Sequence, residues 1–417
     1  MLKRAAKLAV KVIAALVILC LAGTGILLAV LWREHKTEVV LPKPTGPYAV
    51  GRTIFTWSYN KSSNNKSVNN SAREGPDSSV AAREVVVWIW YPAAQAGTAK
   101  TVDYLPTEWR LALAQYSGII MSDFLTRDLS LVKVHSLADR EVSADQPSYP
   151  VVIMRAGGGA LSANYTALAE DLASHGYVVA GIDAPYRTSV VVLPQGRIIV
   201  RPSQNDPDNL TPVQANSLIN RLLPMWVDDI EFVTSQLERL NAADPSGKFT
   251  GRLDMKRLGI FGHSFGGAQG LEFCHDDPRC QAGIDLDGEP FGRVVRDGLK
   301  QPFMILLSDH SHEAADAAHK EILANLQSIY DRLPDGGYFI TIRGANHFSF
   351  SDQMLVKCPL FIPLMRIAGL GRLDGRRGLA ITAEYVHTFF DVYLKGKPRN
   401  AITELSTRYP EVSVEQR

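Results

Sequence analysis

The six residues 262–267, Gly-His-Ser-Phe-Gly-Gly, constrain the fold of this chain more than any other stretch. The apolar residues before them predict a short buried strand, and the residues after them can begin a helix. A strand, Gly-x-Ser-x-Gly and a helix form the sharp turn that presents a nucleophilic serine, here Ser264. Side chains at Gly262 and Gly266 would collide with the neighbouring strand and helix. A glycine-rich turn without catalysis is the alternative, and the flanking strand and helix favour the catalytic interpretation.

The composition is that of a globular protein with a sizeable core. Of 417 residues, 46% are apolar and 21% are charged. The net charge of +1 gives no electrostatic case for nucleic-acid binding or for a polybasic membrane patch. Among the four cysteines, Cys274 and Cys280 are close enough to close a small disulfide loop, or they remain two free thiols. The spacing of Cys and His matches no zinc motif.

The N-terminus has the pattern of a membrane anchor, which we assign to residues 1–36. Four basic residues precede residues 12–32, which carry no charge. A helix of this length spans about 31 Å, enough to cross a bilayer core. The basic residues predict a cytoplasmic N-terminus, with the rest of the chain outside the cytoplasm. The alternative is a cleaved signal peptide, whose apolar region is usually shorter.

The segment 37–83 contains a tether, a first strand at 51–57 and an Asn/Ser-rich insertion. Low apolar content predicts that this insertion is flexible. It carries three Asn-x-Ser triplets that a glycosylating host could modify, at Asn60, Asn65 and Asn69. The catalytic domain is assigned to residues 84–417 and begins with a strand that we expect Pro92 to end.

Within that domain, predicted strands and helices alternate. The strands are expected at 84–92, 151–154, 177–183, 257–261, 282–286 and 302–307, with the last at 338–342, and a small hairpin at 190–200. The helices are expected at 109–116, 122–131, 165–175, 212–241 and 314–332, with the last at 381–393. This alternation predicts an α/β fold with a mostly parallel central sheet and helices on both faces.

A serine nucleophile needs a base, and the base needs an orienting acid. His347 directly follows the last predicted strand, at the sheet edge where α/β sites assemble, and is the preferred base. The other histidines considered fit less well, because they lie before or within helices or too close to the serine: His263, His275, His310, His312, His319 and His387. Asp287 and Asp309 each follow a strand after the serine, and the pattern alone leaves both open as the acid.

Several motifs in order resemble one known family. Besides the serine motif, these are Gly-Ile-Asp-Leu-Asp-Gly at 283–288, Ala-Asn-His-Phe-Ser-Phe-Ser-Asp at 345–352, and residues 171–180. Together they resemble the platelet-activating factor acetylhydrolase family of α/β-hydrolases, in its secreted and type II lineage and bacterial relatives. The resemblance covers about residues 85–397. It implies that the acid follows the strand next after the nucleophile, which makes Asp287 the acid.

The oxyanion hole of such a site uses two backbone N–H groups. One is that of Phe265, and the family's register implies Gly158 as the second. The family often has His-Gly where this chain has Ala156-Gly157. A competing interpretation of the glycines is a dinucleotide-binding fingerprint, but its third glycine is replaced by Ser162 and it leaves the serine motif unexplained.

These observations predict a membrane-anchored, extracytoplasmic serine esterase that needs no metal or cofactor. The resemblance implies phospholipids with short or oxidised acyl chains, or other short-chain esters, as substrates. Acyl transfer to an alcohol and a non-catalytic binding role for the same scaffold are the alternatives. The apolar run at 359–365 either contacts lipid or is buried.

Overall fold

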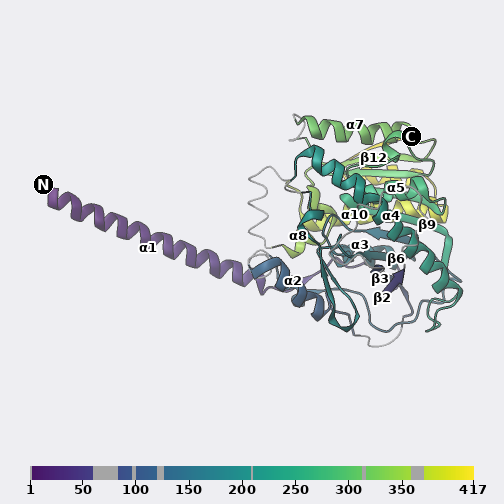
Figure 1. Ribbon diagram of the computed structural model, residues 1–417, viewed down its shortest axis with the longest axis horizontal. Helices are drawn as coiled ribbons and strands as arrows, with labels where there is room; N and C mark the ends of the chain where they lie inside the picture. The colour runs from purple at the N-terminus through teal and green to yellow at the C-terminus, as the bar shows by residue number, and fades with distance from the viewer. Residues whose placement is uncertain are drawn as a thin grey trace.

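We analysed a computed structural model of the chain, which describes residues 2–59, 83–95, 100–119, 126–207, 210–311, 316–357 and 371–417 (Figure 1). The three Asn-x-Ser triplets and the apolar run at 359–365 lie outside the described residues.

The core of the fold is a nine-stranded sheet with the order β13-β12-β11-β10-β9-β5-β6-β3-β2. The six strands from β12 to β6 are parallel to their neighbours, and β13, β3 and β2 pair antiparallel at the two ends. This arrangement confirms the predicted mostly parallel sheet. The strands are β2 Ala49–Tyr59, β3 Arg83–Ala93, β5 Tyr149–Arg155, β6 Val178–Asp183, β9 Leu253–His263, β10 Cys280–Leu286, β11 Phe303–Leu307, β12 Gly337–Ile342 and β13 Val412–Gln416.

Two pairs of short strands lie outside this sheet. They are the parallel pair β1 Val39–Val40 and β4 Val132–Lys133, and the antiparallel pair β7 Val190–Val192 and β8 Ile198–Val200. The second pair is the hairpin that the sequence predicts at 190–200.

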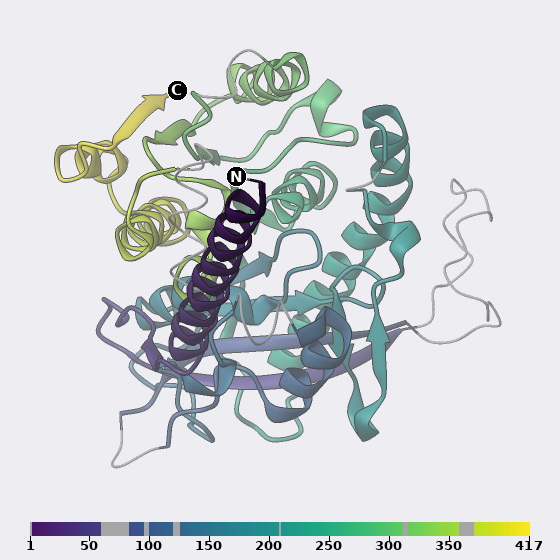
Figure 2. The same cartoon turned by 90° about the vertical axis from the view of Figure 1, so that its left-hand side faces the viewer.

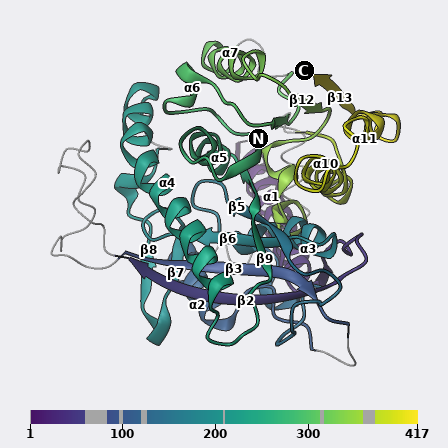
Figure 3. The same cartoon turned by 90° about the vertical axis from the view of Figure 1, so that its right-hand side faces the viewer.

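Helices cover both faces of the sheet (Figure 3). Along β5, Val151 and Ile153 belong to one buried cluster while Val152 and Met154 belong to the other, because successive side chains point to opposite faces. The first cluster is covered by α4 Pro212–Ala242, α5 Phe265–Asp276 and α7 Ala317–Asp331, and the second by α2 Thr107–Ile119, α3 Thr166–Ser174 and α10 Gly375–Lys395. Shorter helices are α6 Val294–Asp297, α8 Gln353–Val356 and α11 Asn400–Glu404.

Helix α1 Leu2–His35 projects from the body of the protein (Figures 1 and 2). From Ala6 to His35 it is long and apolar enough to cross a membrane, and none of its most apolar part is buried. A signal sequence near the N-terminus passes the same test of length and composition, although its apolar region is usually shorter. The end of α1 is fastened to the body, because His35 Nδ1 lies 2.8 Å from Thr126 O and Arg127 Nη1 donates to Glu34 O at 3.1 Å.

Two predictions about strand ends are wrong. β3 runs through Pro92 to Ala93. Pro92 is paired with Val50, and the carbonyl groups of both residues bond outward, to Ser143 N and Leu137 N. At such a pair the backbone N–H also points away from the partner strand. Proline, which has no N–H, therefore removes no hydrogen bond between β3 and β2. The strand at 338–342 is not the last one, because β13 pairs with it at the sheet edge.

Two helix predictions also need correction. The helix predicted at 122–131 is not formed in its described part, where Thr126 bridges to Lys357 and only the 3-10 turn Leu129–Leu131 is helical. The helix at 381–393 is not the last, because α11 follows it. The open question of Cys274 and Cys280 is answered by a disulfide, with a Cα–Cα distance of 5.1 Å, at the end of α5.

Candidate active site

Ser264 lies in the turn between β9 and α5 with φ 55° and ψ −126°. Non-glycine residues rarely adopt positive φ, so this is a strained turn of the kind that presents a nucleophile. A Cβ at Gly262 would lie 2.0 Å from Gly266 O, and one at Gly266 would lie 2.2 Å from Arg155 O. Both glycines are therefore required by close backbone contacts, as the sequence predicts.

Asp287 directly follows β10 and its side chain is almost completely buried. Its Oδ1 accepts hydrogen bonds from Ser308 N and His310 Nε2, both at 2.8 Å. Its Oδ2 accepts from Ser308 Oγ at 2.9 Å and from His347 Nδ1 at 2.8 Å. Burial alone would raise the pKa of Asp287, but the hydrogen bonds from His310 and His347 outweigh it and hold the pKa well below its usual range. The carboxylate is therefore charged at neutral pH.

His347 begins the 3-10 turn His347–Phe350 after β12. Its side chain is 42% exposed, in contrast to the buried carboxylate that it contacts. With Nδ1–H donated to Asp287, the ring keeps Nε2 free of its proton and able to accept one. This is the tautomer that a general base requires.

A chain of hydrogen bonds links the serine turn to the loops on either side of it. Gly157 N donates to Tyr165 Oη at 3.0 Å, and that hydroxyl donates to His263 Nδ1 at 2.7 Å. His263 Nε2–H in turn donates to His347 O at 2.7 Å. Burial, together with the nearby His347, lowers the pKa of His263 to about 3, so the ring is neutral. His263 thus holds the backbone of His347 in place, a role that the sequence analysis missed although the residue adjoins Ser264.

The two aspartates that the pattern left open make different contacts. The carboxylate of Asp309 accepts from backbone N–H groups, at 2.8 Å from Gly344 N and 3.2 Å from Ser311 N, whereas that of Asp287 contacts the ring of His347. His310, set aside as a base, instead contacts the second oxygen of Asp287. The contact exists because β11, which precedes His310, pairs with β10, which precedes Asp287. The sequence alone does not show this pairing.

The loop after β5 carries the other predicted oxyanion residue. Gly158 is exposed, and Gly159, with φ +71°, forms a bridge with Thr188. The buried guanidinium of Arg187 donates to Ala156 O and so fixes the start of this loop.

The dinucleotide interpretation requires an acidic residue at the end of the following strand, which is Asp183 at the end of β6, and the contacts of Asp183 contradict it. A nucleotide site would need this carboxylate for a ribose. In the structure Asp183 is fully buried and accepts from Ser162 N at 2.8 Å and from Trp88 Nε1 at 2.8 Å.

A cavity of about 590 Å³ contains all five predicted site residues. Ser264, Phe265, Asp287, His347 and Gly158 line it. Its apolar wall comes from α4 and α7, through Leu218, Leu222, Trp226, Ile322, Leu323 and Leu326. Its polar part includes Arg187, Arg201, Glu289, His310 and His319. The cavity can therefore offer a bound substrate both apolar contacts and polar partners.

Comparison with known proteins gives consistent results. The sequence model of the family described as platelet-activating factor acetylhydrolase, isoform II, matches residues 34–191 and 219–401. The chain is 24% identical over 408 residues to a protein of Arthroderma benhamiae named "Probable 1-alkyl-2-acetylglycerophosphocholine esterase", a match covering 90% of this chain and 94% of that protein. It is 26% identical over 379 residues to platelet-activating factor acetylhydrolase of Cavia porcellus, covering 86% and 78%. Among solved structures, it is similar to a ferulic acid esterase from Streptomyces cinnamoneus, with a TM-score of 0.71 and 25% identity, covering 91% of this chain and 100% of the other.

Proposed function

The chain belongs to the platelet-activating factor acetylhydrolase, isoform II, family, and from this membership we propose that it hydrolyses esters of short or oxidised acyl chains, with phospholipids as the preferred class. That it is a carboxylic ester hydrolase follows from the relatives and the structural neighbour, which are named esterases or acetylhydrolases. We propose in addition the length of the acyl chain that is hydrolysed and the residues that carry out the reaction.

In the proposed mechanism Ser264 is the nucleophile and His347 is the general base. Asp287 is the carboxylate that orients His347. Ser264 Oγ attacks the ester carbonyl while its proton passes to His347 Nε2. The resulting imidazolium is stabilised by the charged carboxylate of Asp287. When the tetrahedral intermediate collapses, the proton passes to the leaving alkoxide and the acyl group stays on the serine. Water then attacks this acyl-enzyme by the same route, releasing the acid and restoring the serine.

The negative oxygen of each intermediate would be bound by the N–H groups of Phe265 and Gly158. Both residues line the cavity beside Ser264. Phe265 is also the first residue of α5, so the positive end of that helix dipole faces the same place. Backbone donors that are fixed in advance stabilise charge at little cost of reorganisation.

The contact of 2.8 Å between His347 and Asp287, in a cavity that Ser264 lines, carries this proposal. The apolar wall supports an acyl-binding role, because Leu218, Leu222 and Trp226 are buried together on α4. Arg187 and Arg201 also line the cavity, and a guanidinium group is a good partner for a phosphate-bearing head group. Arg201 would then share its charge between the phosphate and Asp206, with which it is paired.

We also propose that α1 is an uncleaved anchor, with its N-terminus in the cytoplasm and the enzyme outside. The disulfide between Cys274 and Cys280 supports an oxidising compartment, where such bonds persist. Removing residues 1–35 tests the anchor, because the shortened chain should leave the membrane fraction and keep its esterase activity. Retention of the shortened chain on vesicles would assign membrane binding to the body of the protein.

The function is tested with the full chain in detergent and its Ser264→Ala variant on a panel of esters of increasing acyl length. We expect hydrolysis that declines with acyl length and vanishes in the variant, together with fluorophosphonate labelling of wild type alone. Hydrolysis that survives in Ser264→Ala would refute the mechanism. Product analysis with added alcohols distinguishes hydrolysis from acyl transfer.

A further inference from the structure

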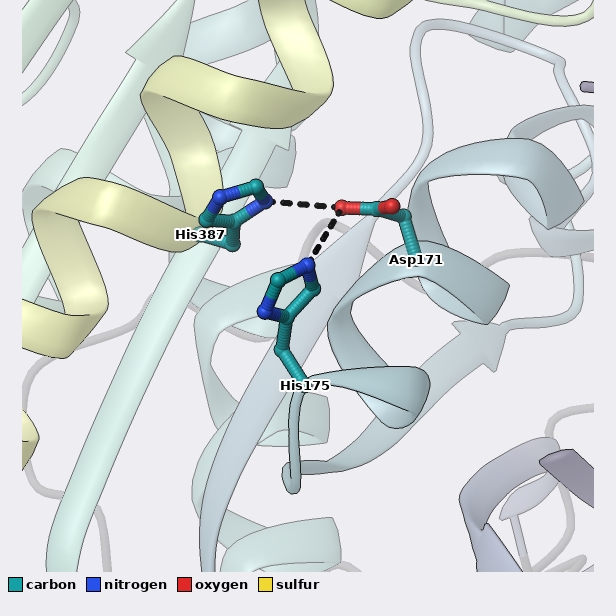
Figure 4. Close-up of side chains that lie close together, drawn as sticks. All are labelled: Asp171, His175 and His387. Carbon is teal, nitrogen blue, oxygen red and sulfur yellow. Dashed lines mark hydrogen bonds and ion pairs between the residues drawn. The ribbon is translucent and has the colours of Figure 1, made fainter. Parts of the chain in front are cut away.

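A second group of ionisable side chains lies between α3 and α10 (Figure 4), and none of its members lines the cavity at Ser264. Asp171 and His175 are four residues apart at the end of α3, and His387 is on α10. Residues four apart lie on the same face of a helix. The segment after α3 leads into the start of β6, whereas Ser264 follows the end of β9, so the group is at the opposite edge of the parallel strands.

The three side chains converge on one oxygen. Asp171 Oδ2 lies 2.8 Å from His387 Nδ1 and 3.9 Å from His175 Nε2. The two imidazole rings are stacked, with centroids 3.9 Å apart. The other carboxylate oxygen, Oδ1, is held by Thr45, whose N and Oγ1 donate at 3.0 and 2.7 Å. The two hydrogen bonds from Thr45 to Oδ1 orient the carboxylate so that Oδ2 faces both imidazole rings.

We propose that Asp171, His175 and His387 bind a divalent transition-metal ion, with Zn²⁺ as the best match. Two imidazole nitrogens and one carboxylate oxygen are ligands that Zn²⁺ accepts. With ligand bonds of about 2.0 Å, two tetrahedral ligand atoms lie about 3.3 Å apart. The observed 2.8 and 3.9 Å bracket that value, and all three ligand atoms lie within 4.8 Å of one another. Binding then requires side-chain movements that turn both ring nitrogens toward the ion. His387 then carries its proton on Nε2 instead of Nδ1. His175, whose Nε2–H donates to Thr45 Oγ1 in the metal-free protein, carries its proton on Nδ1 instead.

A fourth ligand has space beside the group. A cavity of about 370 Å³ is lined by both histidines and can supply a water molecule or a small anion. The basic residues that line this cavity, Lys397 and Arg408, are paired with Asp391 and Glu384 and do not repel the ion strongly. Lys395, which donates to His175 O, is also paired with Asp391, at 3.0 Å. Thr45, whose Oγ1 lies 2.8 Å from His175 Nε2, gives up only that one contact when the metal binds.

The second three-residue group of this kind in the described part of the chain offers a contrast. It consists of Glu272, His275 and Asp276. There the guanidinium of Arg293 already pairs with both carboxylates, so a bound cation would have to displace it. That group therefore serves as the control, not as a second site.

The proposed ion joins three parts of the chain, namely the segment after α1 through Thr45, the end of α3, and α10. Because the site lies away from Ser264, the metal is expected to stabilise the fold without taking part in ester hydrolysis. A readout of metal content and thermal stability therefore tests the proposal independently of the enzyme's activity.

The experiment uses the full chain without a histidine tag, stripped with a chelator, loaded with ZnCl₂ and desalted. We expect about one zinc ion per chain by elemental analysis, a rise in Tm on loading, and visible ligand-field bands when Co²⁺ replaces Zn²⁺. His387→Ala should weaken Zn²⁺ binding more than about tenfold, which is the usual effect of losing even an indirect partner of a metal. His275→Ala should bind as wild type does.

Equal Zn²⁺ binding by wild type and His387→Ala would overturn the proposal, and so would wild type that retains no zinc. If His387→Ala fails to fold by circular dichroism, His175→Ala takes its place, because its imidazole is the more exposed of the two. Loss of zinc in that variant supports the site, and retention overturns it.

Discussion

Replacement of Asp287 by Asn is the most informative single change in the proposed catalytic group. The substitution keeps the shape and removes one charge, leaving one acceptor oxygen and one NH₂ group. The carboxylate now accepts from Ser308 N on Oδ1 and from His347 Nδ1 on Oδ2. A backbone N–H cannot become an acceptor, so the amide oxygen must stay with Ser308. The NH₂ group then faces His347, whose Nδ1 has to accept and whose proton moves to Nε2.

In that tautomer His347 cannot take the proton of Ser264. The same change in a serine protease triad lowers kcat about 10⁴-fold, which corresponds to about 5.4 kcal/mol of activation free energy. We expect a loss of this order in kcat, with a smaller change in KM, because the substrate cavity is unaltered. Steady-state hydrolysis of a short-chain ester measures both, with Tm as the check on folding.

Asp309→Asn is the matched control. The carboxylate of Asp309 accepts from backbone N–H groups, and an amide oxygen can still accept one of them. Loss of one such hydrogen bond lowers the free energy of unfolding by about 1 kcal/mol. Even if the same amount were added to the activation free energy, activity would stay within about tenfold of wild type. Full activity in Asp287→Asn together with a collapse in Asp309→Asn would refute the assignment of the acid.

Three further changes test the surrounding structure. Gly262→Ala places a Cβ 2.0 Å from the carbonyl oxygen of Gly266, so we expect loss of esterase activity and a lower Tm, and an active, stable variant would contradict the close contact. Since the pKa of His263 is about 3 when folded and about 6.5 when unfolded, the unfolded chain takes up the proton first as the pH falls below 6.5. Denaturant titrations should therefore show the free energy of unfolding falling by about 1.4 kcal/mol per pH unit toward pH 3, and His263→Gln should remove this part of the slope. The double variant Cys274→Ala/Cys280→Ala opens a loop with a sequence separation of 6 and should lose about 2 kcal/mol of unfolding free energy, whereas an unchanged value would show that the disulfide adds nothing.

Most of the sheet was predictable because its central strands are continuous apolar runs. Residues 151–154 are buried on both faces, as a parallel strand between two helical layers must be. β13 was missed because only Val412 and Val414 are apolar in a short edge strand whose extended form depends on pairing with β12. The continuation of β3 through Pro92 was also missed, because the hydrogen-bonding side of a residue depends on register.

The candidate site likewise has a part that the sequence predicts and a part that depends on contacts between distant residues. Ser264 is set by a local turn that only glycines permit, so its sequence is diagnostic. The acid could not be chosen from the pattern, because Asp287 and Asp309 both follow strands that end at the same edge. The contact of His310 with Asp287 depends on the pairing of β10 with β11, and the approach of His387 to Asp171 joins residues 216 positions apart. Local sequence carries no record of such contacts.

The anchoring of Asp287 on the adjacent strand has an evolutionary consequence. Its backbone N–H donates to Leu306 O and its carboxylate accepts from Ser308, so the acid is held by the end of β11 although β10 carries it. Ser308 directly precedes Asp309, so the residue that holds Asp287 adjoins the other aspartate considered for the orienting role. A substitution at Ser308 would therefore change how the carboxylate of Asp287 is held, although Ser308 lies after a different strand. Sequence change at the end of β11 can in this way alter the proposed catalytic group while Asp287 itself and the serine turn stay the same.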